Sequence, residues 1–196
     1  TGALMTPAAL RETIRIAIPL LITSLGVALA FKMKFWNIGA EGQICLGAIA
    51  ATYFALFYAD KIPQPFLFLV MFLAGAVFGG LWGLIPAYFK AKFNTNETLF
   101  TLMLNYIAMQ LVSFAIVFWE NPRGSNHVGL INSQGKEGWL PSIGTNSYLL
   151  PILIVLALMV GLYVYMQFSK QGYEIAVVGE SENTARYAGM NVGRII

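Results

Sequence analysis

Two groups of polar residues interrupt sequence that is otherwise apolar, and each could contact a small polar solute. In the first group, Gly39 and Gly42 flank Glu41 where a hydrophobic stretch begins, and Gln43 follows. Glu41 suits the first turn of a helix, since the helix dipole favours a negative charge there. It could instead face a water-filled cavity beside Gln43. A helix broken next to a solute pathway would account for both glycines, and we expect Glu41 and Gln43 to lie on such a pathway.

The second group lies in the apolar stretch that starts near Asn96. At 100° per residue, Glu97, Thr101 and Asn105 fall within an arc of about 80° on one helix face. Polar side chains within an apolar helix are unfavourable unless they find partners or face water. This face therefore either lines the pathway, with Thr101 and Asn105 in contact with solute, or forms a seam of hydrogen bonds to a neighbouring helix.

The residues that catalysis or nucleotide binding would need are missing. The sequence has one histidine, His127, and one cysteine, Cys45, and neither has partners at the spacing of a metal site. It also lacks the Gly-x-x-x-x-Gly-Lys-Ser/Thr loop that holds nucleotide phosphates. We expect a protein that is not an enzyme and that holds no cofactor or metal of its own.

The composition restricts the class of protein further. Hydrophobic residues make up 58% of the 196 residues, charged residues 11%, and the mean hydropathy is +0.68. Soluble domains carry about 25% charged residues, so a soluble enzyme and a free-standing nucleic-acid-binding protein are excluded. A helix that crosses a bilayer needs about 20 apolar residues. Five stretches qualify and none alternates as barrel strands do, which predicts an all-α, polytopic membrane protein with spans at residues 14–31, 38–59, 65–89, 98–119 and 148–168.

The third predicted span carries glycines at four-residue spacing. Gly75, Gly79 and Gly83 fall on one helix face and would let another backbone approach closely. We predict a helix-packing interface there, either static or sliding as the protein moves.

The loops between the spans give an orientation. Lys90 and Lys92 follow the third span directly, and basic residues concentrate in cytoplasmic loops. This places residues 120–147 in an external loop, long enough to dock a partner, and residues 169–194 in the cytoplasm.

The cytoplasmic segment contains the signals of one short helix. Ser181 suits the N-cap, Glu182 the first turn and Gly189 the C-terminal stop. Two helical turns are too few for stability in water. The helix must therefore pack on another surface, and a cytoplasmic protein is the obvious candidate.

Three ordered motifs resemble the permease subunits of bacterial ABC importers for branched-chain amino acids, ribose and nucleosides. They are Asn37 to Gln43, Asn96 to Tyr106 with its Asn-Glu-Thr start, and Gly172 to Gly189. Asn-Pro-Arg-Gly at 121–124 is similar to the nucleoside branch, which depends on a Bmp-type lipoprotein. Family permeases are longer, so this chain would be part of such a transmembrane domain.

The resemblance implies partners and site residues. It implies two permease subunits, identical or paralogous, in the inner membrane, with cytoplasmic ATPases that bind ATP and magnesium and an external solute-binding lipoprotein. It implies that Asn37 to Gln43 lies near the translocation path. It also implies that the short helix from Glu182 to Gly189 is a coupling helix in a groove of the ATPase, so that Ala185 and Arg186 would take part in coupling.

Other functions remain open from the sequence alone. The same fold could import ribose, galactose or riboflavin instead of a nucleoside. An ion-coupled carrier or a channel would need charged residues deep in several spans, and only Glu41 and Glu97 come near, both at span ends. The short capped helix favours an ATPase-coupled permease that works by alternating access.

Overall fold

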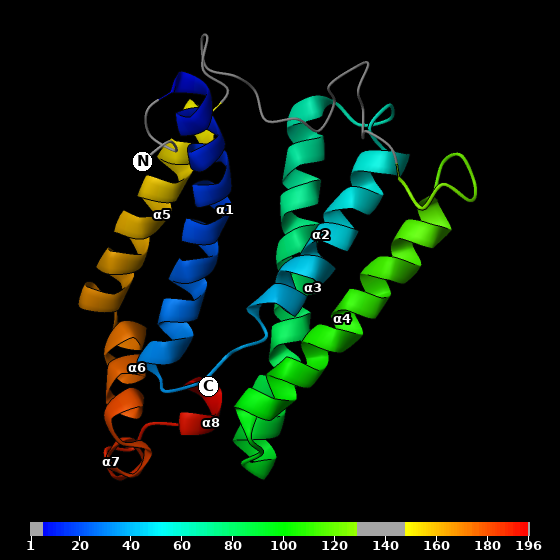
Figure 1. Ribbon diagram of the computed structural model, residues 1–196. Helices are drawn as coiled ribbons and strands as arrows, with labels where there is room; N and C mark the ends of the chain where they lie inside the picture. The colour runs from blue at the N-terminus through cyan, green and yellow to red at the C-terminus, as the bar shows by residue number, and fades with distance from the viewer. Residues whose placement is uncertain (1–5, 129–147, 196) are drawn as a thin grey trace. The chain divides into compact units, whose positions relative to one another are not determined.

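In the computed structural model, residues 6–128 and 148–195 are described, and all regular structure in them is α-helical (Figure 1). This confirms the predicted fold class. The helices are α1 (Pro7–Lys32), α2 (Ala40–Phe57), α3 (Gln64–Phe93), α4 (Glu97–Trp119), α5 (Leu149–Phe168), α6 (Lys170–Glu180), α7 (Glu182–Tyr187) and α8 (Val192–Ile195). Helices α1 to α5 are long and apolar enough to cross a membrane. Compared with the predicted spans, α1 begins earlier and α3 extends through both basic residues at its end.

The described residues form two compact units. One unit contains α1 and α5 to α8, and the other contains α2, α3 and α4.

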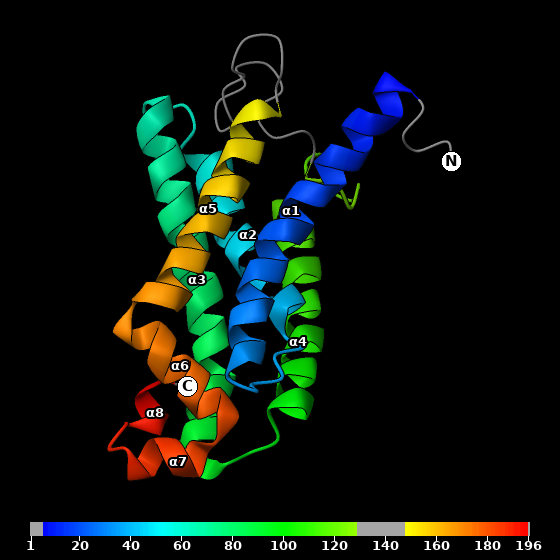
Figure 2. The ribbon, with the colours of Figure 1, turned by 90° about the vertical axis from the view of Figure 1, so that its left-hand side faces the viewer.

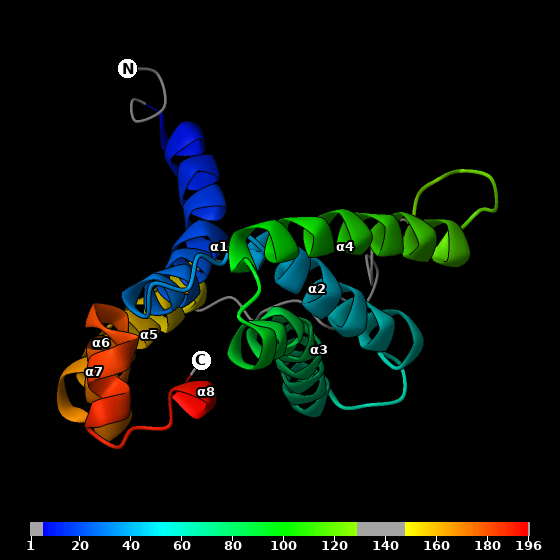
Figure 3. The ribbon, with the colours of Figure 1, turned by 90° about the horizontal axis from the view of Figure 1, so that it is seen from below.

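In the three-helix unit, α2 packs against both α3 and α4 (Figure 3). The glycine face of α3 meets α2 at its backbone. A Cβ on Gly79 would lie 3.0 Å from the backbone carbonyl oxygen of Gln43, and one on Gly83 would lie 3.0 Å from Nε2 of the Gln43 side chain. Gly75 faces Gly47, where an added Cβ would come within 2.9 Å of the Gly75 carbonyl oxygen. Small residues on both helices are therefore what permits this close approach.

In the other unit, α1 packs beside α5, and α6 follows α5 after a turn (Figure 2). Ser169 makes that turn, because its hydroxyl accepts a hydrogen bond from the Gly172 N–H at 2.9 Å. A Cβ on Gly172 would lie 2.6 Å from the Tyr165 carbonyl oxygen, so only glycine fits there. Helix α6 was not predicted from the sequence.

Capping side chains and left-handed residues set the other helix ends. The Asn96 side chain caps α4 by accepting from the Leu99 N–H at 3.2 Å, and Ser181 caps α7 by accepting from the Thr184 N–H at 3.3 Å. Gly189, with φ of +79°, ends α7 as predicted. The predicted external loop is described only through residue 128, and its remainder, residues 129–147, lies outside the described residues.

Candidate functional site

The polar residues at the start of α2 lie alongside α4, well inside the length of that helix. Asn105 hydrogen bonds to residues on both sides of the α2 start. At 1.5 Å per residue, it lies about 12 Å along α4 from Glu97. When α4 spans a hydrocarbon core of about 30 Å, this level lies inside the apolar layer, so regular helical structure is interrupted there.

Such an interruption leaves backbone groups that lipid cannot satisfy. The Asn105 Oδ1 accepts from the Gly42 N–H at 2.9 Å, and its Nδ2 donates to the Ile38 carbonyl oxygen at 2.9 Å. The Thr101 hydroxyl accepts from the Ile38 N–H at 3.2 Å. Two side chains of α4 therefore replace the partners that a continuous helix would have supplied to these backbone groups.

Thr101 and Asn105 are buried, as expected for side chains that hold the start of α2 in place. Their exposed fractions are 0% and 5%, and both side chains face α2. The sequence allowed two roles for this face of α4, a lining of the pathway or a seam of hydrogen bonds to a neighbouring helix. The observed geometry is that of the hydrogen-bonded seam. Direct contact of these two residues with solute stays a prediction.

Gly39 and Gly42 are small because α4 lies directly against them. A Cβ on Gly39 would come within 2.9 Å of the Thr101 Cβ, and one on Gly42 within 2.8 Å of the Asn105 Oδ1. Any larger residue would push the start of α2 away from the side chains that hold it. Close packing against α4 therefore explains why both positions that flank Glu41 are glycine.

The other predicted pathway residues surround this start with different exposures. Asn37 is half-buried, and its Oδ1 accepts from the Gly39 N–H at 2.9 Å, which turns the chain into α2. Glu41 is exposed in the first helical turn. Gln43 is half-buried against Gly83 of α3. Asn37 and Glu41 therefore present polar atoms that a solute could reach.

Two features of this unit were not predicted. The Lys90 ammonium forms an ion pair with the Glu97 carboxylate at 2.9 Å, with side-chain exposures of 20% and 11%, across the α3–α4 turn. The Trp82 indole N–H is buried without a hydrogen-bond partner among the described residues. It lies beside Gly42, since a Cβ there would be 3.1 Å from Trp82 Nε1. The ion pair could have been predicted from the sequence, because Lys90 and Glu97 carry opposite charges and lie seven positions apart on either side of the α3–α4 turn.

The predicted coupling residues divide into two faces of α7. Ala185 is fully buried in a small core with Val178 of α6 and Val192 of α8. Its methyl group therefore fixes the position of α7, and a role of Ala185 in coupling stays a prediction. Glu182 and Arg186 are exposed and lie 3.9 Å apart as a weak ion pair.

The most exposed side chain of α7 was missed by the sequence analysis. Tyr187 is 94% exposed. An exposed aromatic ring is a common anchor in protein interfaces. The order of residues alone gave no signal that distinguished its face from that of Ala185.

Comparisons with known proteins point to one family, the permease components of transport systems. Residues 10–196 match the family described as "Branched-chain amino acid transport system / permease component". The chain is 30% identical, over its whole length, to the nucleoside ABC transporter permease protein NupB of Lactococcus lactis, of which it covers 56%. It is 34% identical over 94% of its length to the guanosine ABC transporter permease protein NupP of Bacillus subtilis, of which it covers 53%.

A relative with a different solute in its name is equally similar. The chain is 34% identical over 93% of its length to the glucose ABC transporter permease protein TsgB13 of Haloferax volcanii, of which it covers 50%. The chain thus spans about half the length of the curated relatives it matches. No solved structure matches it significantly.

Proposed function

The chain belongs to the permease family of branched-chain amino acid transport systems, and on that premise we propose that it is part of the membrane subunit of an ATP-driven nucleoside importer. The observation that carries the proposal is the similarity, over nearly the whole chain, to permeases named for nucleosides and guanosine. The expected location is the cytoplasmic (inner) membrane.

The interrupted start of α2 supports a pathway beside it. Membrane transporters commonly form solute sites where a helix is broken, because freed polar groups then meet a cavity. At this start Glu41 is exposed and Asn37 is half-buried, whereas the half-buried Gln43 packs against Gly83 of α3. In the proposal, Asn37 and Glu41 contact the hydroxyl and amide groups of the solute, while Thr101 and Asn105 hold the α2 backbone in place.

The proposed mechanism is alternating access driven by a separate ATPase. Closure of a pair of ATPase subunits on ATP would displace α7, and the membrane helices would reorient around the solute. The exposed face of α7, with Glu182, Arg186 and Tyr187, is the surface proposed to contact the ATPase. A second permease subunit and an external solute-binding lipoprotein would complete the complex.

An uptake experiment tests this proposal. The full-length permease, its ATPase, its binding lipoprotein and any second permease are reconstituted in proteoliposomes with labelled guanosine or uridine outside. We expect uptake that requires ATP on the ATPase side and persists when ion gradients are collapsed. Uptake that follows an ion gradient without ATP would identify an ion-coupled carrier and refute the proposal.

A sugar is the second candidate solute, because the glucose permease is as similar to the chain as the guanosine permease. Both solutes present several hydroxyl groups, and only a nucleoside also has a flat base. Labelled glucose in the same proteoliposomes distinguishes the two candidates directly.

A further inference from the structure

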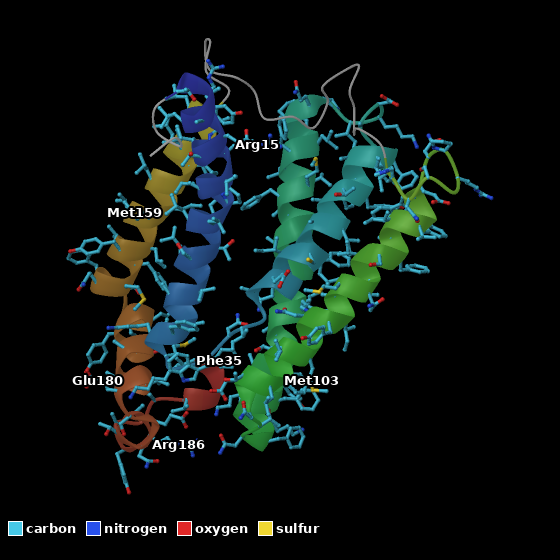
Figure 4. All side chains as sticks on the ribbon, in the orientation of Figure 1. Arg15, Phe35, Met103, Met159, Glu180 and Arg186 are labelled. Atoms are coloured by element: carbon cyan, nitrogen blue, oxygen red, sulfur yellow. The ribbon has the colours of Figure 1, made fainter. Side chains whose placement is uncertain are left out.

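The C-terminal ends of α1 and α6 are in direct contact. Gly179 is buried there, and a Cβ at this position would overlap the Lys32 carbonyl oxygen and lie 3.3 Å from the Met33 Cα. One residue further along, the Glu180 carbonyl oxygen accepts a hydrogen bond from the Lys34 ammonium at 3.2 Å. In Figure 4, Glu180 and Phe35 lie at the same end of this unit and Arg15 lies at the other. We call this pair of interactions the α1–α6 contact.

The α1 side of this contact has a defined backbone. Lys34 has a φ of +55°, and the next N–H, that of Phe35, donates to the Ala30 carbonyl oxygen at 3.1 Å. The Lys34 N–H itself donates to the Phe31 carbonyl oxygen at 2.9 Å. This is a Schellman motif, which ties the chain beyond the helix back to its last turn. Phe35 is buried at 8% exposure, which adds an apolar anchor.

The α6 side of the contact is joined firmly to α7. Ser181 ends α6 and also caps α7, so no linker separates the two helices. Val178 of α6 packs with Ala185 of α7 and Val192 of α8 in one buried cluster. Because Val178 is adjacent to Gly179, a displacement of α7 must also displace the α1–α6 contact.

We propose that the α1–α6 contact transmits the movement of α7 to the start of α2. Beyond Lys34, only residues 35–38 lie outside helical or turn structure before Gly39, the N-cap of α2. A segment of this length reaches at most about 14 Å, which limits how far the end of α1 can move without also moving the start of α2. The inference rests on the proposed function, because it assumes that an ATPase moves α7.

The inference makes Gly179 a positioning residue, whose substitution separates ATP hydrolysis from transport. In the reconstituted importer, Gly179→Val should lower guanosine uptake per ATP hydrolysed at least tenfold, while ATP hydrolysis stays within twofold of wild type. Gly161→Val is the matched control, because a Cβ at Gly161 of α5 meets no described residue within 4 Å. A Gly179→Val variant that transports as efficiently as Gly161→Val would overturn the proposal.

A second variant covers the case in which Gly179→Val does not fold. Lys34→Gly removes the ammonium that binds the Glu180 carbonyl but suits the left-handed conformation at this position. We expect an unchanged Tm and a threefold or larger loss of uptake per ATP. Unchanged uptake per ATP in this variant would refute the transmission role of the α1–α6 contact.

A third measurement does not depend on the solute. Hydrogen exchange of residues 35–42 is followed in the full-length permease bound to its ATPase, with and without ATP. Wild type and Gly161→Val should show an ATP-dependent change in exchange, and Gly179→Val should show none. An equal change in all three proteins would overturn the inference, whereas absence of guanosine uptake by wild type would refute only the proposed nucleoside import.

Discussion

Replacing Asn105 with leucine tests how the start of α2 is held. The substitution removes two hydrogen bonds at 2.9 Å and leaves the Gly42 N–H and the Ile38 carbonyl oxygen without those partners. An unsatisfied buried polar group costs about 1–3 kcal/mol, although hydrogen bonds between membrane helices average about 0.6 kcal/mol. The two backbone groups lie at a helix start and Asn105 is only 5% exposed, so water offers little compensation. We therefore expect a total loss of about 3 kcal/mol.

The measurement is thermal unfolding of the purified full-length permease in detergent, followed by tryptophan fluorescence. The relatives are about twice as long as this chain, and for a protein of that size a loss of about 3 kcal/mol corresponds to a decrease in Tm of about 4 °C. Thr101→Val removes only the bond to the Ile38 N–H and should cost about half as much in free energy. Ser113→Leu is the control, because the Ser113 hydroxyl is exposed and bonds within its own helix. A Tm of Asn105→Leu equal to that of the control would refute the role assigned to Asn105.

Three further predictions concern packing, charge and the α7 surface. Gly79→Leu should lower the Tm of the permease by several degrees, because its Cβ would lie 3.0 Å from the Gln43 carbonyl oxygen. Gly80→Leu should not lower it, because a Cβ there meets no atom within 4 Å in the described part of the chain. Equal Tm values for the two variants would contradict close α2–α3 packing. Lys90→Met removes the ammonium that lies 2.9 Å from the Glu97 carboxylate. It should lower the free energy of unfolding, measured by chemical denaturation, by about 3 kcal/mol, which is in the range for broken buried ion pairs. A loss near zero would show that the pair is solvated. Tyr187→Ala should leave the Tm unchanged, since the ring is 94% exposed. It should weaken binding of the ATPase about tenfold in a pull-down titration. Unchanged affinity would exclude Tyr187 from the surface that contacts the ATPase.

The membrane helices could be predicted because their signal is local. Apolar runs of sufficient length predict a helix whatever it packs against, and the cap at Ser181 predicted the short helix α7 from an equally local signal. Helix α6 was missed because its two glycines and its charged residues disguise the pattern. Its buried positions, Gly172, Ile175, Val178 and Gly179, nevertheless follow the helical period, and Ser169 provides a cap. Counting glycine as a buried small residue would have revealed this helix.

The candidate site could be predicted only in part. Helical periodicity placed Thr101 and Asn105 on one face, but their partners Ile38 and Gly42 lie more than sixty positions away in sequence. Local patterns carry no information on which backbone those side chains meet. In the same way, Ala185 was expected at a partner surface, whereas α6 and α8 bury it. Which face of a short helix is free depends on the neighbours that the fold supplies.

The most direct test of nucleoside import is competition for uptake by the complete importer in proteoliposomes. ATP-driven uptake of labelled guanosine is measured with excess unlabelled uridine, glucose, ribose or riboflavin. The proposed function predicts that uridine blocks the uptake and that the two sugars and riboflavin do not. Block by glucose or ribose would contradict selectivity for nucleosides, and ATP-driven uptake of labelled glucose with none of guanosine would contradict nucleoside import and favour a sugar.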